Sequence, residues 1–372
     1  MPTRRRFLST LGSTALLAPA ARSQAPSVEP WFISRGTNKE MRWDFMRRGG
    51  LLVPNRLFFV RNHTTAPKLD PASWRLELGG TGLMQPRSFT YDELLALPSR
   101  SIIRSLECAG NGRSYFGSVQ SEPAPGTQWT LGAIGVAEWT GVPLREVLER
   151  SGLRRGARDV MPVGLDDQRV RRPLPRAKAL HEDTLLVYAM NGETLPVEHG
   201  FPIRLLVPGW VGIASIKWVG RIEVSEQPLL SPWNTEQYVV PDPSAPDGKR
   251  ALTEMPVKAA FELPPEAHLP AGRQTLRGRA WSGTGKIRRV EVSADDGRTW
   301  DTARLCTPNL LGAWVRWEWV WDAPPGLHVL RARATDDRGR TQPDRAQFNP
   351  QGYLFDAVAP HPVRVGLPGR VG

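Results

Sequence analysis

The sequence predicts an α+β domain followed by an all-β sandwich of immunoglobulin type. Two observations predict this order. Up to about residue 245, two capped helical segments lie among short apolar strand candidates, which is typical of an α+β domain. From about Pro256 onward, runs of alternating apolar and polar residues replace the helical periodicity, which is typical of a sandwich of about 110 residues. A chain of 372 residues is long enough for two or three domains.

The first 25 residues have the features of an export signal. Arg4, Arg5 and Arg6 precede an apolar stretch at residues 7–21, and residues 23–25 (SQA) offer a small-x-small cleavage pattern. This arrangement matches the twin-arginine type of signal, which predicts export of a folded, cofactor-loaded protein to the periplasm. Its removal would lower the formal net charge from +12 to +8. No other apolar stretch reaches the length of about 20 residues that spans a bilayer, so we predict no membrane span in the mature chain.

The basic charge comes mainly from arginines that are dispersed between acidic residues and strands. Nucleic-acid binding would favour a clustered basic stripe, so we predict no nucleic-acid partner. A dispersed positive charge suits an anionic substrate and an acidic redox partner instead.

Helix and strand signals within the first domain follow one another closely. We assign residues 26–54 to an arm that wraps on the next domain, and we predict a strand at residues 57–60. Thr90 and Glu93 form a capping box for a helix that ends at Pro98. Pro143 suits the first position of a second helix, which ends before Gly152. Further strands are predicted at residues 102–106, 203–207 and 216–224.

The second domain follows residues 241–246, whose Pro, Asp and Ser content indicates a linker or a surface loop. Strands are predicted at residues 276–281, 287–293, 314–321 and 329–334, with a hairpin turn at residues 295–297 (DDG) between two of them. The alternation places Trp317, Trp319 and Trp321 on one face of their strand. The predicted units are therefore a signal at residues 1–25, an arm at 26–54, a first domain at 55–245 and a second domain at 246–372.

Cys108 is one of only two cysteines in the chain, and it lies where a predicted strand meets a Gly-rich turn. A thiolate there, with Arg113 five residues further on, is suited to hold a soft metal and to receive an anion. On residue type alone, a lone cysteine is more often a small buried hydrophobic residue. We predict no disulfide with Cys306, which we interpret as a packed thiol.

Several ordered segments resemble the sulfite oxidase family of molybdopterin oxidoreductases, and the resemblance covers nearly all of the mature chain. The segments are residues 58–63 (FFVRNH), 108–111 (CAGN), 164–166 (GLD), 199–204 (HGFPIR) and 216–218 (IKW). The segment at residues 280–283 (AWSG) resembles the family's dimerisation domain. The resemblance implies a pterin dithiolene that holds molybdenum, with Cys108 as the single protein ligand to the metal.

The resemblance also implies roles for residues around the metal. Those expected to bind the pterin and its phosphate are Phe59, Arg61, Asn62, His63, Asp166, His199, Arg204, Ser215, Ile216 and Lys217. Those expected to meet the substrate are Arg61, Arg113, Trp129 and Tyr238. By residue type alone, Lys217 fits a solvent-facing strand and Trp129 fits a core.

The chain departs from the pattern of the animal enzymes at three places. Gly112 replaces an arginine, and Pro125 replaces a lysine. A further arginine of the family aligns ambiguously around Arg316 and Trp317. These departures weaken the expectation for sulfite but not the expectation for molybdenum.

The resemblance implies a periplasmic sulfite dehydrogenase that passes electrons to a cytochrome c and forms a homodimer through the sandwich. A second alternative is another substrate: the molybdenum subunit of a sulfur-compound dehydrogenase complex (SoxC-like), or a reductase of oxidised methionine. The methionine sulfoxide reductases of the superfamily lack the sandwich domain, which counts against this alternative here. A third alternative is an exported binding or adhesion protein that keeps the architecture without the metal.

Overall fold

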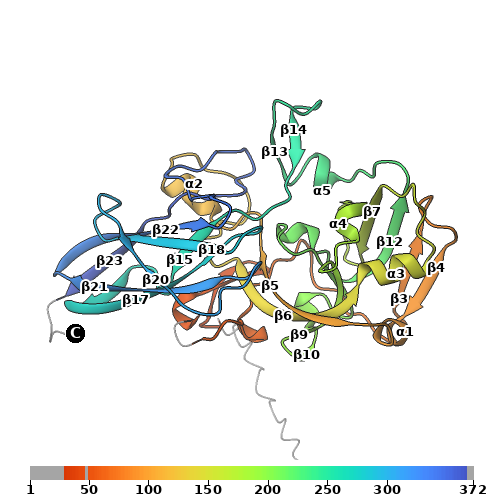
Figure 1. Ribbon diagram of the computed structural model, residues 1–372, viewed down its shortest axis with the longest axis horizontal. Helices are drawn as coiled ribbons and strands as arrows, with labels where there is room; N and C mark the ends of the chain where they lie inside the picture. The colour runs from red at the N-terminus through yellow and green to blue at the C-terminus, as the bar shows by residue number, and fades with distance from the viewer. Residues whose placement is uncertain (1–28, 47–48, 367–372) are drawn as a thin grey trace, which may run out of the picture.

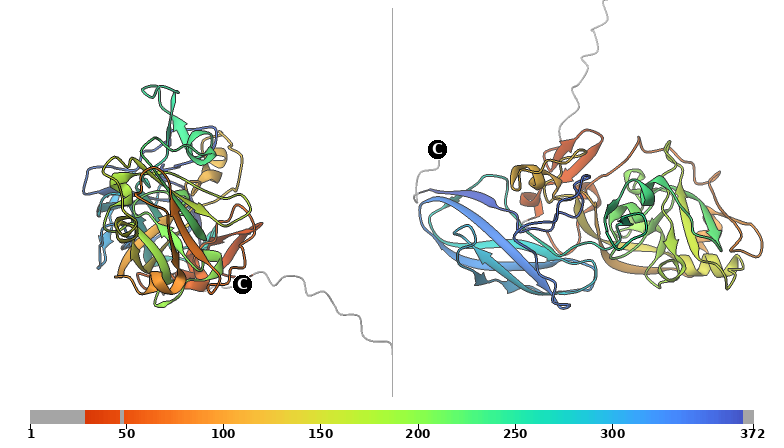
Figure 2. Two further views of the ribbon diagram at one scale, coloured as in Figure 1. Left: turned by 90° about the vertical axis from the view of Figure 1, so that its right-hand side faces the viewer. Right: turned by 90° about the horizontal axis from the view of Figure 1, so that it is seen from above.

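The computed structural model describes residues 29–46 and 49–366, so the predicted export signal lies outside the described residues. The molecule is elongated and has two lobes (Figure 1). The N-terminal arm and the short helix α2 (Arg113–Ser118) lie at the junction between the lobes (Figure 2). No helix in the described part of the chain is long and apolar enough to cross a membrane.

Two five-stranded sheets form the first lobe. The first sheet is antiparallel and has the order β10-β9-β6-β5, with β11 also paired to β9. Its strands are β5 (Arg100–Glu107), β6 (Ile134–Pro143), β9 (Leu185–Met190), β10 (Glu193–Thr194) and β11 (Arg204–Leu206).

The second sheet has the order β4-β3-β12-β7-β8, in which β12 runs parallel to β3 and the other pairs are antiparallel. Its strands are β3 (Arg75–Gly79), β4 (Arg87–Thr90), β7 (Asp159–Gly164), β8 (Leu174–Pro175) and β12 (Val219–Ser225). The short helices of this lobe are α1 (Tyr91–Leu95), α3 (Leu144–Arg150), α4 (Arg176–Ala179), α5 (Pro232–Thr235), η2 (Asn55–Leu57), η3 (Val197–His199) and η4 (Gly212–Ala214).

Both helices predicted from the sequence are present, as α1 and α3. The Thr90 hydroxyl accepts from the Glu93 amide at 3.1 Å, and the Glu93 carboxylate accepts from the Thr90 amide at 2.7 Å, which confirms the capping box of α1. Helix α3 begins one residue after Pro143, which is the last residue of β6 rather than the first of the helix. The strands predicted at residues 102–106 and 203–207 are present as β5 and β11.

Two predicted strands need correction. Residues 57–60 do not form a strand: η2 ends at Leu57, and Phe58 and Phe59 are both buried, so the alternation of a strand is absent. The strand predicted at residues 216–224 begins only at Val219, because Trp218 has a left-handed φ of 53°. Lys217 therefore lies in a turn and not on a solvent-facing strand.

The arm contacts both lobes. It contains the hairpin of β1 (Phe32–Arg35) and β2 (Asn38–Met41), followed by η1 (Trp43–Met46). The Met41 amide donates to the Gly132 carbonyl of the first lobe at 3.1 Å. The Trp43 ring stacks on Trp281 of the second lobe, with centroids 6.0 Å apart.

The second lobe is the predicted sandwich of two sheets. One sheet has the order β15-β17-β21-β20 and the other has the order β16-β23-β22-β18-β19. Their strands are β15 (Lys258–Phe261), β16 (Ala267–Pro270), β17 (Gly272–Trp281), β18 (Ile287–Ser293), β19 (Asp301–Thr302), β20 (Arg304–Leu305), β21 (Val315–Ala323), β22 (Gly326–Asp336) and β23 (His361–Gly366).

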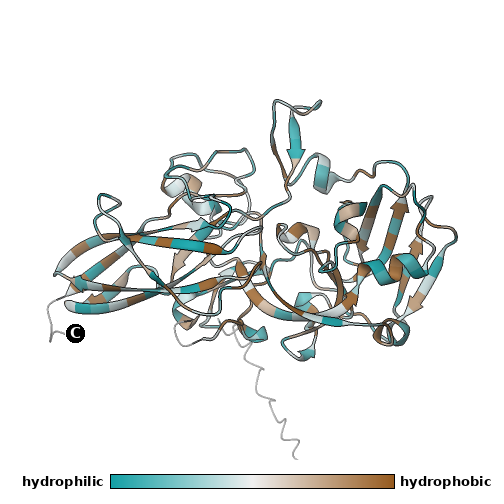
Figure 3. Cartoon of the chain, in the orientation of Figure 1, coloured by the Kyte–Doolittle hydropathy of each residue, from teal (hydrophilic) through white to brown (hydrophobic). Residues whose placement is uncertain are grey.

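The predicted alternation within the sandwich is confirmed. Trp317, Trp319 and Trp321 are buried, whereas Val320 is 50% exposed. Apolar and polar residues alternate along the long strands of this lobe in Figure 3. The turn at residues 295–297 joins β18 to the short strand β19, and the main partner of β18 is β22.

A hairpin of β13 (Val239–Pro241) and β14 (Lys249–Ala251) projects from the molecule between the lobes (Figure 1). Residues 241–246 lie in this hairpin, so they form a surface loop. The hairpin follows directly after Tyr238, which has a left-handed φ of 55°. Such a backbone is uncommon for a residue other than glycine and is often found near functional sites.

Candidate active site

Cys108 follows the last residue of β5 and opens a tight turn into α2. The Cys108 amide donates to the Ala133 carbonyl at 2.9 Å, and the Asn111 amide donates to the Cys108 carbonyl at 2.9 Å. Gly112 has a φ of +94°, and a side chain there would meet Phe355 at 2.9 Å. The arginine that the animal enzymes carry at this place would therefore not fit here.

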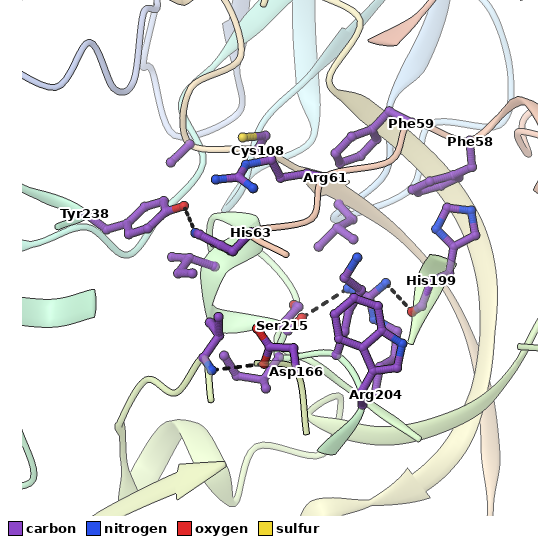
Figure 4. Close-up of a pocket in the computed structure, with 18 residues that line it drawn as sticks. Phe58, Phe59, Arg61, His63, Cys108, Asp166, His199, Arg204, Ser215 and Tyr238 are labelled. Carbon is purple, nitrogen blue, oxygen red and sulfur yellow. Dashed lines mark hydrogen bonds between the residues drawn. The ribbon is translucent and has the colours of Figure 1, made fainter. Parts of the chain in front are cut away.

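Cys108 lies where two pockets meet. The first pocket is lined by aromatic, apolar and charged side chains, a combination typical of a cofactor site. Figure 4 shows its lining, which includes most of the residues expected to bind a pterin. Beside Cys108, the expected metal ligand, those in the lining are Phe59, Arg61, His63, Asp166, His199, Arg204, Ser215, Ile216 and Lys217.

Arg204 is the strongest anion-binding feature of the first pocket. It begins β11, and its side chain is 3% exposed. Its Nη1 and Nη2 donate to the carbonyls of His199 and Ser215 at 2.9 and 3.2 Å, while its buried Nε has no partner among the described residues. Burial lowers the pKa of Arg204 to about 9, so the side chain remains charged at neutral pH. The guanidinium also lies over the Trp139 ring, 5.1 Å from its centroid, and no carboxylate pairs with it among the described residues. A buried charge of this kind fits a bound anion.

Two histidines in the pocket are neutral. Burial lowers the pKa of His199 to about 3, with a further contribution from the positive charges of Lys217 and Arg204. Burial and the charge of Arg61 lower the pKa of His63 to about 3 as well. Neutral imidazoles can donate or accept hydrogen bonds without adding charge to the pocket.

Asn62 and Lys217 form a polar support beside the pocket. Asn62 does not line it, but its amide nitrogen donates to Glu198 at 2.8 Å and its amide oxygen accepts from Lys217. Lys217 also donates to the Glu198 carbonyl at 2.9 Å, and burial lowers its pKa. Asp166 accepts from the Val170 amide at 3.0 Å, which orients its carboxylate.

The second pocket shares Arg61, Cys108 and Tyr238 with the first pocket. Its lining contains two arginines and two tyrosines together with neutral residues: Arg61, Cys108, Arg113, Pro125, Gly126, Thr127, Gln237, Tyr238, Gln351 and Tyr353. Tyr238 and His63 share a hydrogen bond of 3.0 Å between the phenol oxygen and Nε2, which joins the two pockets. Burial raises the pKa of Tyr238, so the phenol keeps its proton at neutral pH.

Arg113 is fitted closely into the second pocket. Its Nε donates to the Gln351 carbonyl at 3.0 Å, and its Nη1 donates to the Thr127 carbonyl at 3.1 Å. A side chain at Gly110 or Gly126 would come within 2.8 Å of its guanidinium nitrogens. The glycines thus leave room for one cation beside Cys108.

Sequence reasoning missed Gln351 and Tyr353, which line the second pocket from the segment between β22 and β23. The Tyr353 ring stacks on Tyr238 with centroids 4.9 Å apart, and the Gln351 side chain accepts from the Tyr238 amide at 3.1 Å. The only local signal was a Gly- and Pro-containing turn at residues 349–353 (NPQGY), which does not indicate a contact with the first domain.

Three other positions differ from their expected places. Trp129 is fully buried behind Phe59, with ring centroids 6.5 Å apart, and it is not part of the lining of either pocket. Arg316 pairs with Glu262 at 3.3 Å, and Trp317 lies in the core of the sandwich. Neither of these last two residues reaches the pockets that adjoin Cys108.

The chemistry of the first pocket fits a molybdenum pterin. Within residues 29–46 and 49–366, no three His, Cys, Asp or Glu side chains converge on one point. A dithiolene would bring most of the metal's ligands with it, so Cys108 alone could complete such a site. The unpartnered Arg204 Nε and the nearby Lys217 suit a phosphate at the other end of the pocket.

Acid stability of the apoprotein is expected to depend on His199. Its pKa is lower in the folded state than the ordinary value of 6.5, so the unfolded state binds more protons between pH 6.5 and about 3. Stability is therefore lost as the pH falls below 6.5. In His199→Phe, the loss in the free energy of unfolding between pH 7 and pH 4.5 should shrink by about 2 to 3 kcal/mol. Urea titrations of the wild-type and His199→Phe apoproteins at pH 7 and pH 4.5 measure this loss in the free energy of unfolding.

His268 on β16 provides the matched control, because its side chain is exposed. His268→Phe should leave the pH dependence unchanged. An unchanged dependence in His199→Phe as well would show that His199 is not held neutral by the fold.

Comparisons with known proteins cover both lobes. Residues 63–233 match the oxidoreductase molybdopterin binding domain, and residues 249–359 match the Mo-co oxidoreductase dimerisation domain. The sulfite oxidase of Gallus gallus is 38% identical over 335 residues, which are 82% of this chain and 72% of that protein. The mitochondrial sulfite oxidase of Homo sapiens is 36% identical over 330 residues, which are 82% of this chain and 60% of the human protein.

A solved structure is also similar along most of the chain. It is the sulfane dehydrogenase SoxCD from Paracoccus pantotrophus, with a TM-score of 0.79 and 29% sequence identity. The match covers 95% of this chain and 93% of that chain.

Proposed function

Because the chain belongs to the sulfite oxidase family of molybdenum oxidoreductases, we propose that it oxidises sulfite to sulfate in the periplasm and passes the electrons to a cytochrome c. The protein is an oxidoreductase whose cofactor is molybdenum bound to molybdopterin. The observation that carries the proposal is the position of Cys108, where a pocket suited to the pterin meets a pocket suited to a small anion.

The first pocket would hold the cofactor. Arg204 and Lys217 would bind the phosphate, and Cys108 would bind the metal. When bound, the cofactor supplies a redox centre that takes up two electrons and releases them singly. The neutral His63 would hold the Tyr238 hydroxyl toward the metal side of the pocket.

The second pocket would hold sulfite. The Arg113 and Arg61 guanidinium groups would bind its oxygens, and a guanidinium fork matches two oxygens at once. Sulfite and water become sulfate with the release of two protons and two electrons. The protonated Tyr238 would donate a hydrogen bond to the anion, because its pKa is raised by burial.

The electron acceptor, the compartment and the assembly are part of the same proposal. The twin-arginine pattern of residues 4–8 supports export to the periplasm, where a cytochrome c would accept electrons one at a time. The match of residues 249–359 to a dimerisation domain supports a homodimer formed through the sandwich.

A second candidate function is supported by the similarity to the sulfane dehydrogenase, which extends over 95% of the chain. The lining of the second pocket also includes the neutral residues Pro125, Gln237 and Gln351. These features are compatible with a molybdenum subunit that acts on a larger sulfur compound within a complex. The same pocket geometry would then admit a substrate with fewer negative charges than sulfite.

The test combines metal analysis with steady-state assays of the purified holoenzyme. We expect about one molybdenum per chain and turnover of sulfite with cytochrome c as acceptor. Thiosulfate, sulfane sulfur compounds and a sulfoxide are assayed beside it. Turnover of a sulfane compound without sulfite turnover would favour the second candidate, and a chain without molybdenum would contradict both.

Replacement of Arg113 by methionine should weaken substrate binding. The variant loses a charged hydrogen-bond donor at the pocket, which is worth about 1.5 to 3 kcal/mol. We therefore expect the KM for sulfite to rise by about 10- to 100-fold, with unchanged molybdenum content. Arg113→Lys keeps the charge without the fork, and its KM should lie between those of the other two forms. A wild-type KM in Arg113→Met would remove Arg113 from the substrate site.

A further inference from the structure

An ion pair between the two lobes lies directly behind the Cys108 turn. Lys258, the first residue of β15, reaches from the second lobe to Glu107, the last residue of β5, with Nζ 2.8 Å from Oε1. Both side chains are at most 2% exposed. Neither residue lines the pockets that meet at Cys108, so the pair touches neither the pterin site nor the substrate site.

The Lys258 ammonium joins the two ends of the turn that carries Cys108. Besides the Glu107 carboxylate, it donates to the Asn111 carbonyl at 2.7 Å. The Asn111 side chain closes the same loop by donating to Glu107 Oε1 at 2.9 Å. Residues 107 and 111 are therefore held by one cation, with Cys108 between them.

The second lobe also fixes the other oxygen of the carboxylate. Trp281 Nε1 donates to Glu107 Oε2 at 3.1 Å. Trp281 lies in β17 opposite Lys258 in the β15 to β17 pairing, so the two donors share one rigid piece of sheet. Both carboxylate oxygens are thus occupied by partners from the sandwich.

Stability alone gives a weak reason for such a pair. Taking two charges out of water costs free energy that their attraction only partly offsets, and an apolar pair of similar volume is often as stable. What the pair provides is a fixed geometry, because a buried and fully bonded network has one arrangement. The fixed element here is the turn that directs the Cys108 sulfur into the pocket.

We propose that Lys258 is a positioning residue for the metal ligand: through Glu107 and Asn111 it sets the direction of the Cys108 thiolate at molybdenum. The proposal rests on the proposed role of Cys108 as the ligand. It makes the sandwich domain a part of the metal site and not only an interface between protomers.

The experiment compares the wild-type holoenzyme with Lys258→Met, a variant of similar side-chain length without the charge. The electron paramagnetic resonance spectrum of the Mo(V) state is the main measurement, because partners behind a metal ligand orient that ligand and thereby tune the metal. We expect shifted g values in the variant. We also expect kcat to fall by about 10- to 100-fold, as for a misplaced reacting group, with the KM for sulfite changed by less than about twofold.

Two further variants separate positioning from stability. Arg279→Met removes another cation that is at most 1% exposed, and this cation pairs with Glu262 and with carbonyls of the arm instead of with the Cys108 turn. It should lower stability and leave the g values unchanged. The double variant Glu107→Gln with Lys258→Met leaves no unpaired buried charge, so it should fold even where the single variant does not.

The double variant should regain stability while its g values stay shifted. Wild-type g values in a folded Lys258→Met or in the double variant would overturn the proposal. Cys108→Ser is measured beside them: an unchanged Mo(V) spectrum in that variant would refute the role of Cys108 itself. A changed spectrum in Cys108→Ser together with wild-type g values in the Lys258 variants would refute only the role of Lys258.

Discussion

Replacement of Cys108 by serine is expected to abolish turnover while the fold survives. Loss of a residue that merely supports a metal ligand costs about 10- to 100-fold in activity or metal affinity. Loss of the ligand itself should therefore lower kcat by more than about 100-fold. Serine is close to cysteine in size, and Cys108 lies in a turn held by backbone hydrogen bonds, so the circular dichroism spectrum and the melting temperature should change little.

Cys306→Ser is the matched control. Cys306 is the other free cysteine, is half-buried after β20, and lines neither of the pockets at Cys108. Steady-state sulfite assays and molybdenum analysis of both variants show whether the loss is specific to Cys108. Full activity in Cys108→Ser would contradict the proposed function, and equal losses in both variants would indicate a general effect of thiol removal.

The second large effect is expected for Arg204→Met, which should lose the cofactor without losing the fold. The variant removes the buried guanidinium that lines the first pocket and with it the Nε donor that has no partner among the described residues. At about 1.5 to 3 kcal/mol for one charged hydrogen bond, cofactor affinity should fall by a factor of about 10 to 100. Molybdenum content after purification should drop accordingly.

Arg172→Met is the matched control for Arg204→Met. Arg172 is equally buried and also donates to two backbone carbonyls, those of Trp233 and Leu252, but it does not line the pterin pocket. Each variant loses two hydrogen bonds to carbonyls and relieves one buried charge. Their apoproteins should thus shift in stability in the same direction. A similar loss of molybdenum in both variants would show that Arg204 acts only through the fold.

Features of the fold that depend on neighbouring residues were predictable from the sequence. The Thr90 capping box is an interaction over three residues, and the alternation of Trp317, Trp319 and Trp321 follows from the pleat of one strand. The prediction of a strand at residues 57–60 was wrong because Phe58 and Phe59 are both buried. The sequence of a short apolar run does not show whether one face or both faces of the segment will be buried.

Those residues of the candidate site that lie in short sequence motifs could be predicted. The first pocket brings together residues from five such motifs, and Cys108 lies where the sequence placed it, at the end of a strand. Gln351 and Tyr353 could not be predicted, because their contacts with Arg113 and Tyr238 join positions more than 100 residues apart. The fully buried position of Trp129 behind Phe59 likewise depends on the packing of separate elements.

The wall that Gln351 and Tyr353 give to the second pocket has a consequence for how far the two ends of the chain depend on each other. The Arg113 side chain has the Gln351 carbonyl as a partner only when the segment between β22 and β23 is in place. A fragment that ends before this segment would leave Arg113 without this partner and Tyr238 without the stacked ring of Tyr353. An isolated first domain should therefore have an incomplete second pocket.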